Sequence, residues 1–209
     1  MIQADSLQCR IEAATVIRSG GIVAFRTDTF YGLGVDPLDP VAVETIKGLK
    51  GREETKPILL LVSDLAEIDR LIINRSEIFD LVANCFWPGP ITLIGRARPE
   101  LPQGLTAGTG SIGVRLPDDE SVRDLVRTCG GAITATSANT SGNLPARTAK
   151  EVANYFPRGL DLIIDGGEVS VTEPSTVLDL SGTPRLIREG VIKQEAIEEM
   201  LSRIGSRLD

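Results

Sequence analysis

Short apolar runs alternate with stretches of helical periodicity along this chain, and this alternation restricts the fold more than any other feature. The apolar runs predict buried strands at residues 22–25, 57–62, 91–94, 112–116, 132–136, 162–164, 176–180 and 186–187. The intervening segments predict helices over residues 10–19, 40–50, 119–128 and 194–204, others beginning near Asp64 and Ser76, and one from Thr148 to Tyr155. Several strand pairs are close enough in sequence to be antiparallel. The pattern predicts an α/β fold with one twisted, mixed sheet of about seven strands flanked by helices.

Chain length favours a single domain. The 209 residues can bury a sizeable core, and no repeat, linker or low-complexity segment divides them. We therefore expect residues 1–209 to form one domain that ends in the helix predicted at residues 194–204.

Charge and cysteine content limit the possible partners. The net charge of -7 argues against broad nucleic-acid binding, so at most weak direct RNA binding is expected. Cys9, Cys85 and Cys129 lie far apart, which is typical of reduced thiols in the cytoplasm. The N-terminus lacks the pattern of a signal peptide, and no apolar run approaches the roughly 18 residues of a membrane span. We expect a cytoplasmic protein that does not enter a membrane.

The chain contains no histidine, which excludes several kinds of chemistry. Ser-His and Cys-His catalysis and every histidine-based metal site are ruled out. Catalysis would have to use carboxylates, Lys, Arg, hydroxyls, backbone dipoles or a loosely held hard cation.

A basic loop interrupts this acidic chain between residues 47 and 57. Lys47, Lys50, Arg52 and Lys56 fall within ten residues, where the amphipathic helix at 40–50 breaks at Gly51. An arginine can bond two oxygens at once and lysines act as mobile point charges, so the loop could hold an anionic ligand. The alternative is that these cations simply favour a helix C-terminus and a solvated loop.

One apparent dinucleotide-binding motif lacks the flanking elements that such a motif requires. Gly108-Thr109-Gly110-Ser111-Ile112-Gly113 spells the dinucleotide fingerprint, but that motif needs a strand before it and a helix after it. Here a loop precedes and a strand follows, so we reject a dinucleotide-binding fold.

Polar residues next to the predicted strands are better candidates for a ligand site. Polar stretches follow two strands at residues 27–32 and 137–139, and a third, 174–176, precedes another. Ligands commonly bind at strand ends in α/β proteins, although such turns more often satisfy their own backbone. Arg115 lies within a strand between Val114 and Leu116, where it points either to a solvated face or to a ligand.

Together these segments resemble the YrdC/TsaC family, the L-threonylcarbamoyladenylate synthases, over roughly residues 10–192. The resemblance rests on an ordered set of segments: 27–34, Lys50-Gly51-Arg52, 87–93, 113–117, Ser137-Ala138-Asn139, 165–167, 174–177 and 188–190. The family pairs a Lys-x-Arg element with a Ser-x-Asn element, and this chain has both. Arg26 stands where the family usually has Pro, and Leu61 where many members have His.

The resemblance implies an enzyme that condenses L-threonine, bicarbonate and ATP to threonylcarbamoyl-AMP and pyrophosphate. Other proteins would then transfer the threonylcarbamoyl group to tRNA. Lys50 and Arg52 are the implied catalytic residues. The implied threonine-binding residues are Thr27, Tyr31, Arg115 and Ser175. The implied ATP-binding residues are Lys50, Arg52, Lys56, Ser111, Ser137, Asn139 and Arg188. The resemblance implies Mg²⁺ as a cofactor bound through the phosphates, with no protein ligand.

Two alternatives remain from the sequence. One is a non-catalytic YrdC-like paralogue that binds a nucleotide or RNA, which the intact Lys-x-Arg and Ser-x-Asn elements argue against. The other is the carbamoyl-adenylate chemistry of the related domain in hydrogenase-maturation proteins. That domain normally belongs to a much longer chain.

Overall fold

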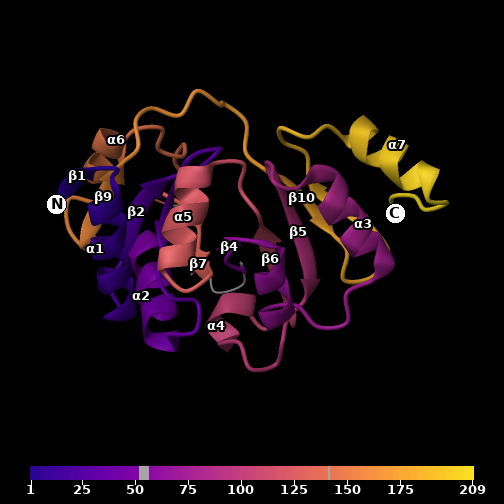
Figure 1. The fold of residues 1–209 in the computed structure, drawn as a ribbon, viewed down its shortest axis with the longest axis horizontal. Coiled ribbons are helices and arrows are strands. Elements are labelled where there is room, and N and C mark those ends of the chain that lie inside the picture. The colour runs from indigo at the N-terminus through magenta and orange to yellow at the C-terminus, as the bar shows by residue number, and fades with distance from the viewer. Residues whose placement is uncertain (52–56, 141) are drawn as a thin grey trace.

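A computed structural model of the chain, which describes residues 1–51, 57–140 and 142–209, contains two mixed sheets with helices around them (Figure 1). The α/β class is confirmed, but the strands divide between two sheets instead of forming one sheet of about seven strands. The two chain ends lie at opposite ends of the long axis, and the segment between β9 and β10 crosses from one sheet to the other.

The first sheet has five strands in the order β1-β9-β2-β3-β8. Their bounds are β1 Ile2–Ala4, β9 Leu162–Asp165, β2 Val23–Arg26, β3 Tyr31–Gly34 and β8 Thr136–Ser137. β1, β9 and β2 are parallel, whereas β2–β3 and β3–β8 are antiparallel pairs. The sequence pattern did not reveal β3, because it contains two glycines. Gly34 is required there because a Cβ would approach the Phe25 ring to 2.7 Å.

The second sheet has six strands in the order β11-β10-β5-β6-β4-β7. Their bounds are β11 Arg185–Arg188, β10 Thr176–Asp179, β5 Ile91–Arg96, β6 Ser111–Arg115, β4 Leu60–Val62 and β7 Ala132–Thr134. The predicted strand at 132–136 is therefore extended, but it leaves this sheet after Thr134 and enters the other at Thr136. At the crossing, Thr134 donates its backbone N–H to the Val35 carbonyl and Ala135 donates to that of Leu59.

The helices begin and end largely where their capping residues predict. They are α1 Leu7–Arg18, α2 Pro40–Lys50, η1 Leu65–Arg70, α3 Glu77–Phe86, α4 Gln103–Thr106, α5 Glu120–Thr128, α6 Ala149–Tyr155 and α7 Gln194–Arg203. Asp39 caps α2, which ends at Gly51 in the left-handed conformation. A capping box of Thr148 and Glu151 opens α6, the helix predicted from Thr148 to Tyr155. No helix in the described ranges is long and apolar enough to cross a membrane.

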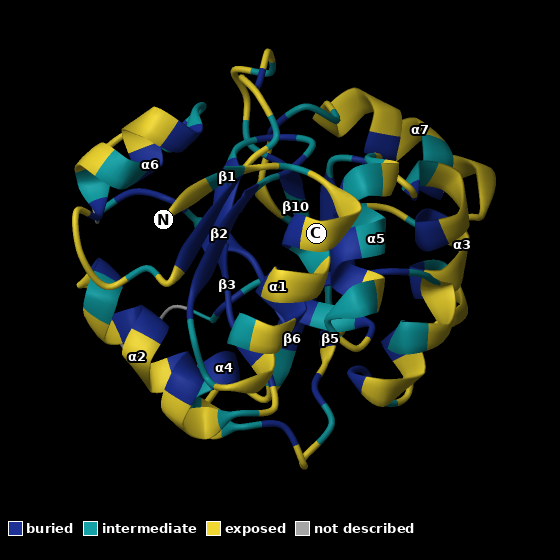
Figure 2. Ribbon diagram, turned by 60° about the vertical axis from the view of Figure 1, so that its left-hand side comes forward, coloured by how far each residue is buried: buried dark blue, intermediate teal, exposed yellow. Residues whose placement is uncertain are grey.

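Two clusters of buried hydrophobic side chains each join the two sheets. The larger contains Ala24 and Leu33 from the first sheet together with Leu93 and Val114 from the second. The smaller contains Phe25 from the first sheet and Ile133 from the second. The strands in the middle of the molecule are buried, whereas the helices around them expose their outer faces (Figure 2). The segment before β6 is held against the larger cluster by α4, since Leu105 is buried and its carbonyl accepts a hydrogen bond from the Ile58 N–H.

Candidate functional site

A cavity of about 320 Å³ is lined by residues from both sheets. Its volume lies in the range of small-ligand pockets. From the second sheet, residues of the three neighbouring strands β10, β5 and β6 line the cavity. The first sheet contributes Tyr31 and Gly32 from β3 and, through β8, Thr136 and Ser137.

Arg115 extends from the end of β6 into the gap between the sheets. The side chain is 3% exposed. Of the two orientations that the sequence allowed, toward solvent or toward a ligand site, the structure therefore has the inward one. Its Nη1 donates to Thr29 Oγ1 at 3.0 Å and its Nη2 to Thr27 Oγ1 at 3.3 Å. Asp28 Oδ1 lies 3.2 Å from Nη2. Burial lowers the pKa of Arg115, and the nearby Asp28 carboxylate opposes that shift.

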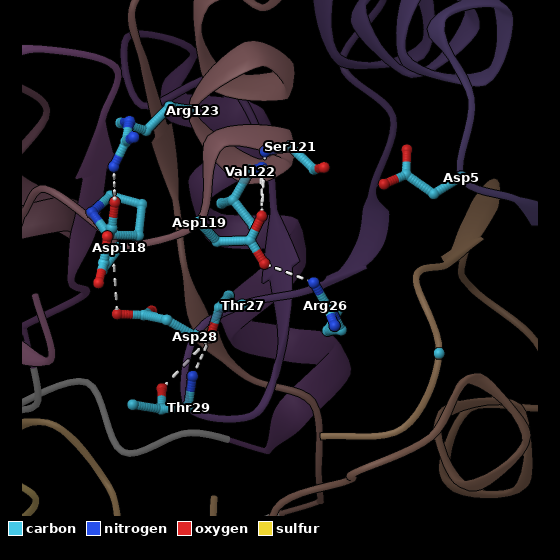
Figure 3. Close-up of polar contacts among 12 residues, drawn as sticks. Asp5, Arg26, Thr27, Asp28, Thr29, Asp118, Asp119, Ser121, Val122 and Arg123 are labelled. Carbon is cyan, nitrogen blue, oxygen red and sulfur yellow. Dashed lines mark hydrogen bonds and ion pairs between the residues drawn. The ribbon is translucent and has the colours of Figure 1, made fainter. Parts of the chain in front are cut away.

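The β2–β3 loop, which bonds Arg115, is also tied to the start of α5 (Figure 3). Arg26 points toward Asp119, and their charged atoms are 2.5 Å apart. The other oxygen of Asp119 caps α5 by accepting from Ser121 N at 3.0 Å. Asp28 Oδ2 accepts from Asp118 N at 3.4 Å. These contacts connect the loop of one sheet to the strand–helix junction of the other, beside Arg115.

Ser175 and Arg188 form the end of the cavity near β10 and β11. Arg188 Nη2 donates to the Ser175 carbonyl at 2.8 Å, and the Ser175 hydroxyl lies 3.1 Å from Thr92 Oγ1. Burial lowers the pKa of Arg188, and repulsion from Arg115 lowers it further. Two cations that repel each other across one cavity create an environment suited to an anion.

Lys50 meets the Ser-x-Asn element at another edge of the cavity. Lys50 is the last residue of α2, and its ammonium group donates to the Ser137 carbonyl and lies 3.4 Å from Asn139 Oδ1. Ser137 Oγ donates to that same Asn139 oxygen at 2.6 Å. The structure thus brings together two elements separated by more than eighty residues in the sequence. Arg52 and Lys56 lie outside the described residues.

The remaining candidates are placed less centrally. Tyr31 lines the cavity, but its hydroxyl donates to the Gly167 carbonyl at 2.8 Å. Burial, followed by the Asp165 charge, raises the pKa of Tyr31 to about 12. Ser111 begins β6, and its hydroxyl pairs with that of Thr109 at 3.0 Å. Sequence reasoning missed Thr92 and Gly113 as lining residues, although the matching segments contain both.

The site offers little to bind a metal directly. Within residues 1–51, 57–140 and 142–209, no group of three or more cysteine and carboxylate side chains is placed to hold a metal ion. Among the described residues, those that line the cavity have hydroxyl, arginine or apolar side chains, or are glycines.

A family model and the similar proteins of known sequence all point to the same family. The Sua5/YciO/YrdC family model, described as "Telomere recombination", matches residues 15–190. A threonylcarbamoyl-AMP synthase of Pyrococcus abyssi is 37% identical over 193 residues, which cover 92% of this chain and 57% of that protein. One of Bacillus subtilis is 34% identical over 92% of this chain and 56% of that protein. This chain thus spans little more than half the length of these relatives.

A solved structure shares the same fold. The crystal structure of P. abyssi Sua5 complexed with L-threonine has a TM-score of 0.92 and 34% sequence identity, and it covers all of this chain and 61% of that one.

Proposed function

This chain belongs to the Sua5/YciO/YrdC family, and we propose that it is an L-threonylcarbamoyladenylate synthase. The enzyme condenses L-threonine, bicarbonate and ATP to threonylcarbamoyl-AMP and pyrophosphate, a nucleotidyl transfer. The observation that carries the proposal is the meeting of Lys50 with Ser137 and Asn139 beside a cavity that also holds Arg115 and Arg188. The names of the similar proteins support it, as does the bound threonine in the P. abyssi structure.

The chemistry needs positioning and charge rather than a nucleophilic side chain. The threonine amine adds to bicarbonate and water leaves, which gives a carbamate. A carbamate oxygen then attacks the α-phosphorus of ATP, and the bond to the β-phosphate breaks to release pyrophosphate. Both steps build negative charge that fixed cations stabilise, and neither requires the histidine that this chain lacks.

The proposed roles divide among three groups of residues. Lys50, together with Arg52 and Lys56, would hold the triphosphate and the carbamate. Ser111, Ser137, Asn139 and Arg188 would contact ATP. Thr27, Tyr31 and Ser175 would surround threonine, while Arg115 pairs with its carboxylate. Mg²⁺ bound to the phosphates would neutralise charge on the leaving pyrophosphate.

The product would serve tRNA modification in the cytoplasm. Threonylcarbamoyl-AMP is an activated acyl donor, so separate transferase proteins would take it to the target adenosine of tRNA. The net charge of -7 is consistent with an enzyme that needs at most weak contact with RNA itself.

Mass spectrometry tests the proposal directly. We expect the purified protein, given ATP, Mg²⁺, bicarbonate and L-threonine, to form a threonine-dependent adduct of AMP with an equal amount of pyrophosphate. ATP that stays intact, in a protein that still binds it, would favour the non-catalytic paralogue.

Replacement of Lys50 tests the residue that carries the proposal. Lys50→Ala should lower the rate of adduct formation at least 100-fold, because a cation next to the developing charge is lost. Lys47→Ala is the matched control. Lys47 lies on the same helix, where its buried side chain pairs with Glu44 at 3.0 Å, so its loss should leave the rate within about twofold. A Lys50→Ala variant with full turnover would remove the assignment.

A further inference from the structure

Arg26, the last residue of β2, reaches from the first sheet to the helix that follows β6 of the second. Its Nη2 lies 2.5 Å from Oδ2 of Asp119, the N-cap of α5, and the two side chains point toward each other (Figure 3). The Arg26 side chain also lies across the backbone of Gly166, which follows β9. A Cβ at Gly166 would approach Arg26 Cβ to 3.1 Å and Nε to 3.3 Å. The missing side chain at Gly166 therefore gives Arg26 the room to extend toward α5.

The three residues that follow Arg26 contact the guanidinium group of Arg115. Thr27 and Thr29 accept hydrogen bonds from it, and Asp28 pairs with it through Oδ1. All three contacts come from the β2–β3 loop, whereas Arg115 is the last residue of β6. The position of this loop relative to the end of β6 therefore decides where the hydrogen-bond partners of Arg115 lie.

Two contacts hold the same loop against the N-terminus of α5. One is the hydrogen bond from the Asp118 N–H to Asp28 Oδ2, which is long at 3.4 Å. The other is the ion pair of Arg26 with Asp119, which is short and joins two full charges. Charge-assisted bonds are stronger than neutral ones, so the ion pair is the firmer of the two. Its loss would leave the loop held to α5 mainly by the long bond.

We propose that the ion pair between Arg26 and Asp119 positions the β2–β3 loop around Arg115, which makes Arg26 and Asp119 positioning residues for substrate binding. The inference rests on the proposed function, in which Arg115 pairs with the substrate carboxylate. Arg26 stands where the family usually has Pro, and proline carries no charged group that could reach Asp119. The ion pair is thus a feature of this chain added to the family's common site.

Neutralisation of Arg26 tests this role. Arg26→Met keeps the aliphatic packing over Gly166 and loses the charge. Kd and KM for threonine should rise about three- to fivefold, a modest change because the Arg26 side chain is 34% exposed and such ion pairs are weak. The kcat and the KM for ATP should stay within about twofold, since the pair acts on substrate binding alone. Arg26→Lys restores a cation and should recover most of the threonine affinity.

A charge reversal separates the ion pair from the packing of the side chain. Arg26→Glu places a second carboxylate beside Asp119, and the repulsion should raise the KM for threonine about tenfold or more. Asp119→Asn in the same chain removes that repulsion and keeps a residue suited to the N-cap. The double variant should therefore bind threonine better than Arg26→Glu alone, with an affinity close to that of Arg26→Met.

Arg10→Met is the matched control for the loss of an ion pair to α5. Arg10 pairs with Asp5 at 2.8 Å and with Asp124 of α5 at 3.5 Å. These contacts lie on α5 beyond its first turn and do not involve the β2–β3 loop. The variant should be less stable than the wild type and keep the Kd for threonine within about twofold.

The outcomes separate the positioning role from the synthase. An unchanged Kd for threonine in folded Arg26→Met and Arg26→Glu would overturn the positioning role, as would a loss in Arg26→Glu that Asp119→Asn does not relieve. If the wild type forms the adduct and these variants match it, the synthase stands alone. If the wild type binds threonine without forming an adduct, the synthase is rejected and the Kd values still decide the role of Arg26. Absence of any threonine binding by the wild type would reject both.

Discussion

At the scale of single residues, the side chain of Arg115 is held by hydrogen bonds and an ion pair, yet one of its buried polar atoms lacks a hydrogen-bond partner, which costs folding free energy. Arg115 Nε is buried without a hydrogen-bond partner in the described structure, and Asp28 Oδ1, also buried, has only its ion pair with Arg115 Nη2 there. An unmet buried group costs about 1–3 kcal/mol. Folding alone gives no reason to place a desolvated guanidinium between two sheets, and such costs concentrate at functional sites. The sequence could show that Arg115 interrupts an apolar strand. It could not show which way the side chain points, because that depends on the first sheet, which is formed by residues distant in sequence.

Tyr31 should make the stability of the protein sensitive to high pH. Its folded pKa of about 12 exceeds the unfolded value of about 10, so the unfolded state loses the proton first. The stabilisation is complete below pH 10 and is lost as pH rises toward 12. Wild-type protein should therefore lose about 2 kcal/mol more than Tyr31→Phe between pH 9.5 and 11.5. Urea unfolding at several pH values measures this difference.

Tyr155→Phe provides the control for that experiment, because Tyr155 is the other tyrosine of the chain and lies in α6. In that variant Tyr31 keeps its phenol, so the Tyr31 contribution of about 2 kcal/mol between pH 9.5 and 11.5 should persist. At pH 7, Tyr31→Phe should cost about 1 kcal/mol through the lost bond to Gly167. Parallel pH curves for wild type and Tyr31→Phe would contradict the assigned burial of the phenol.

At the scale of elements, Asp119 performs two tasks that substitutions can separate. It caps α5 through one oxygen and pairs with Arg26 through the other. Asp119→Asn keeps a good N-cap but loses the ion pair, so it should cost up to about 1 kcal/mol, as should Arg26→Ala. Asp119→Ala loses both and should cost about 1 kcal/mol more. Urea unfolding at low salt and at about 1 M salt would reveal the charge component, which salt weakens.

The double variant Arg26→Ala with Asp119→Asn completes the cycle. Its cost should be smaller than the sum of the two single costs, because both remove the same ion pair. Arg75→Ala is a matched control, since Arg75 pairs with Asp69 and Asp80 far from α5 in sequence and its cost should add to that of Asp119→Asn. Simple additivity of Arg26→Ala and Asp119→Asn would show that the pair does not act in solution.

Elements with local signals were predictable, and elements defined by distant partners were not. Asp39, Pro40 and Gly51 mark α2 within the segment itself, so its bounds matched the sequence prediction. The strand at 132–136 has a purely local pattern as well. Its division between two sheets depends on Val35 and Leu59, which bond its backbone from elsewhere. For the same reason, the contact of Lys50 with Asn139 could not be predicted from local sequence patterns, because these do not show how close α2 lies to the turn after β8.

At the scale of the whole molecule, the two sheets do not form two separate cores. Each of the two hydrophobic clusters contains residues of both sheets, and the chain between Thr134 and Thr136 passes directly from one sheet to the other. The cavity therefore lies inside one unit rather than between two independent ones. The prediction of one sheet of about seven strands was wrong because the number of sheets depends on which strands pair with each other. The residues within a strand do not reveal its partners.

A shared core predicts that residues 1–209 unfold as one cooperative unit. Trp87, the only tryptophan, lies beside the second sheet at the turn before β5 and packs edge-on against Phe79 at 6.1 Å between ring centroids. Its fluorescence reports on that part of the molecule, whereas far-ultraviolet circular dichroism reports on all helices and strands. Loss of the first sheet would expose the apolar face of the second, so neither should persist alone. In urea the two signals should have the same midpoint, and calorimetric and van't Hoff enthalpies should agree. A Trp87 transition clearly separated from the circular-dichroism transition would mean that the sheets are distinct domains, and the cavity between them would then depend on how the domains dock.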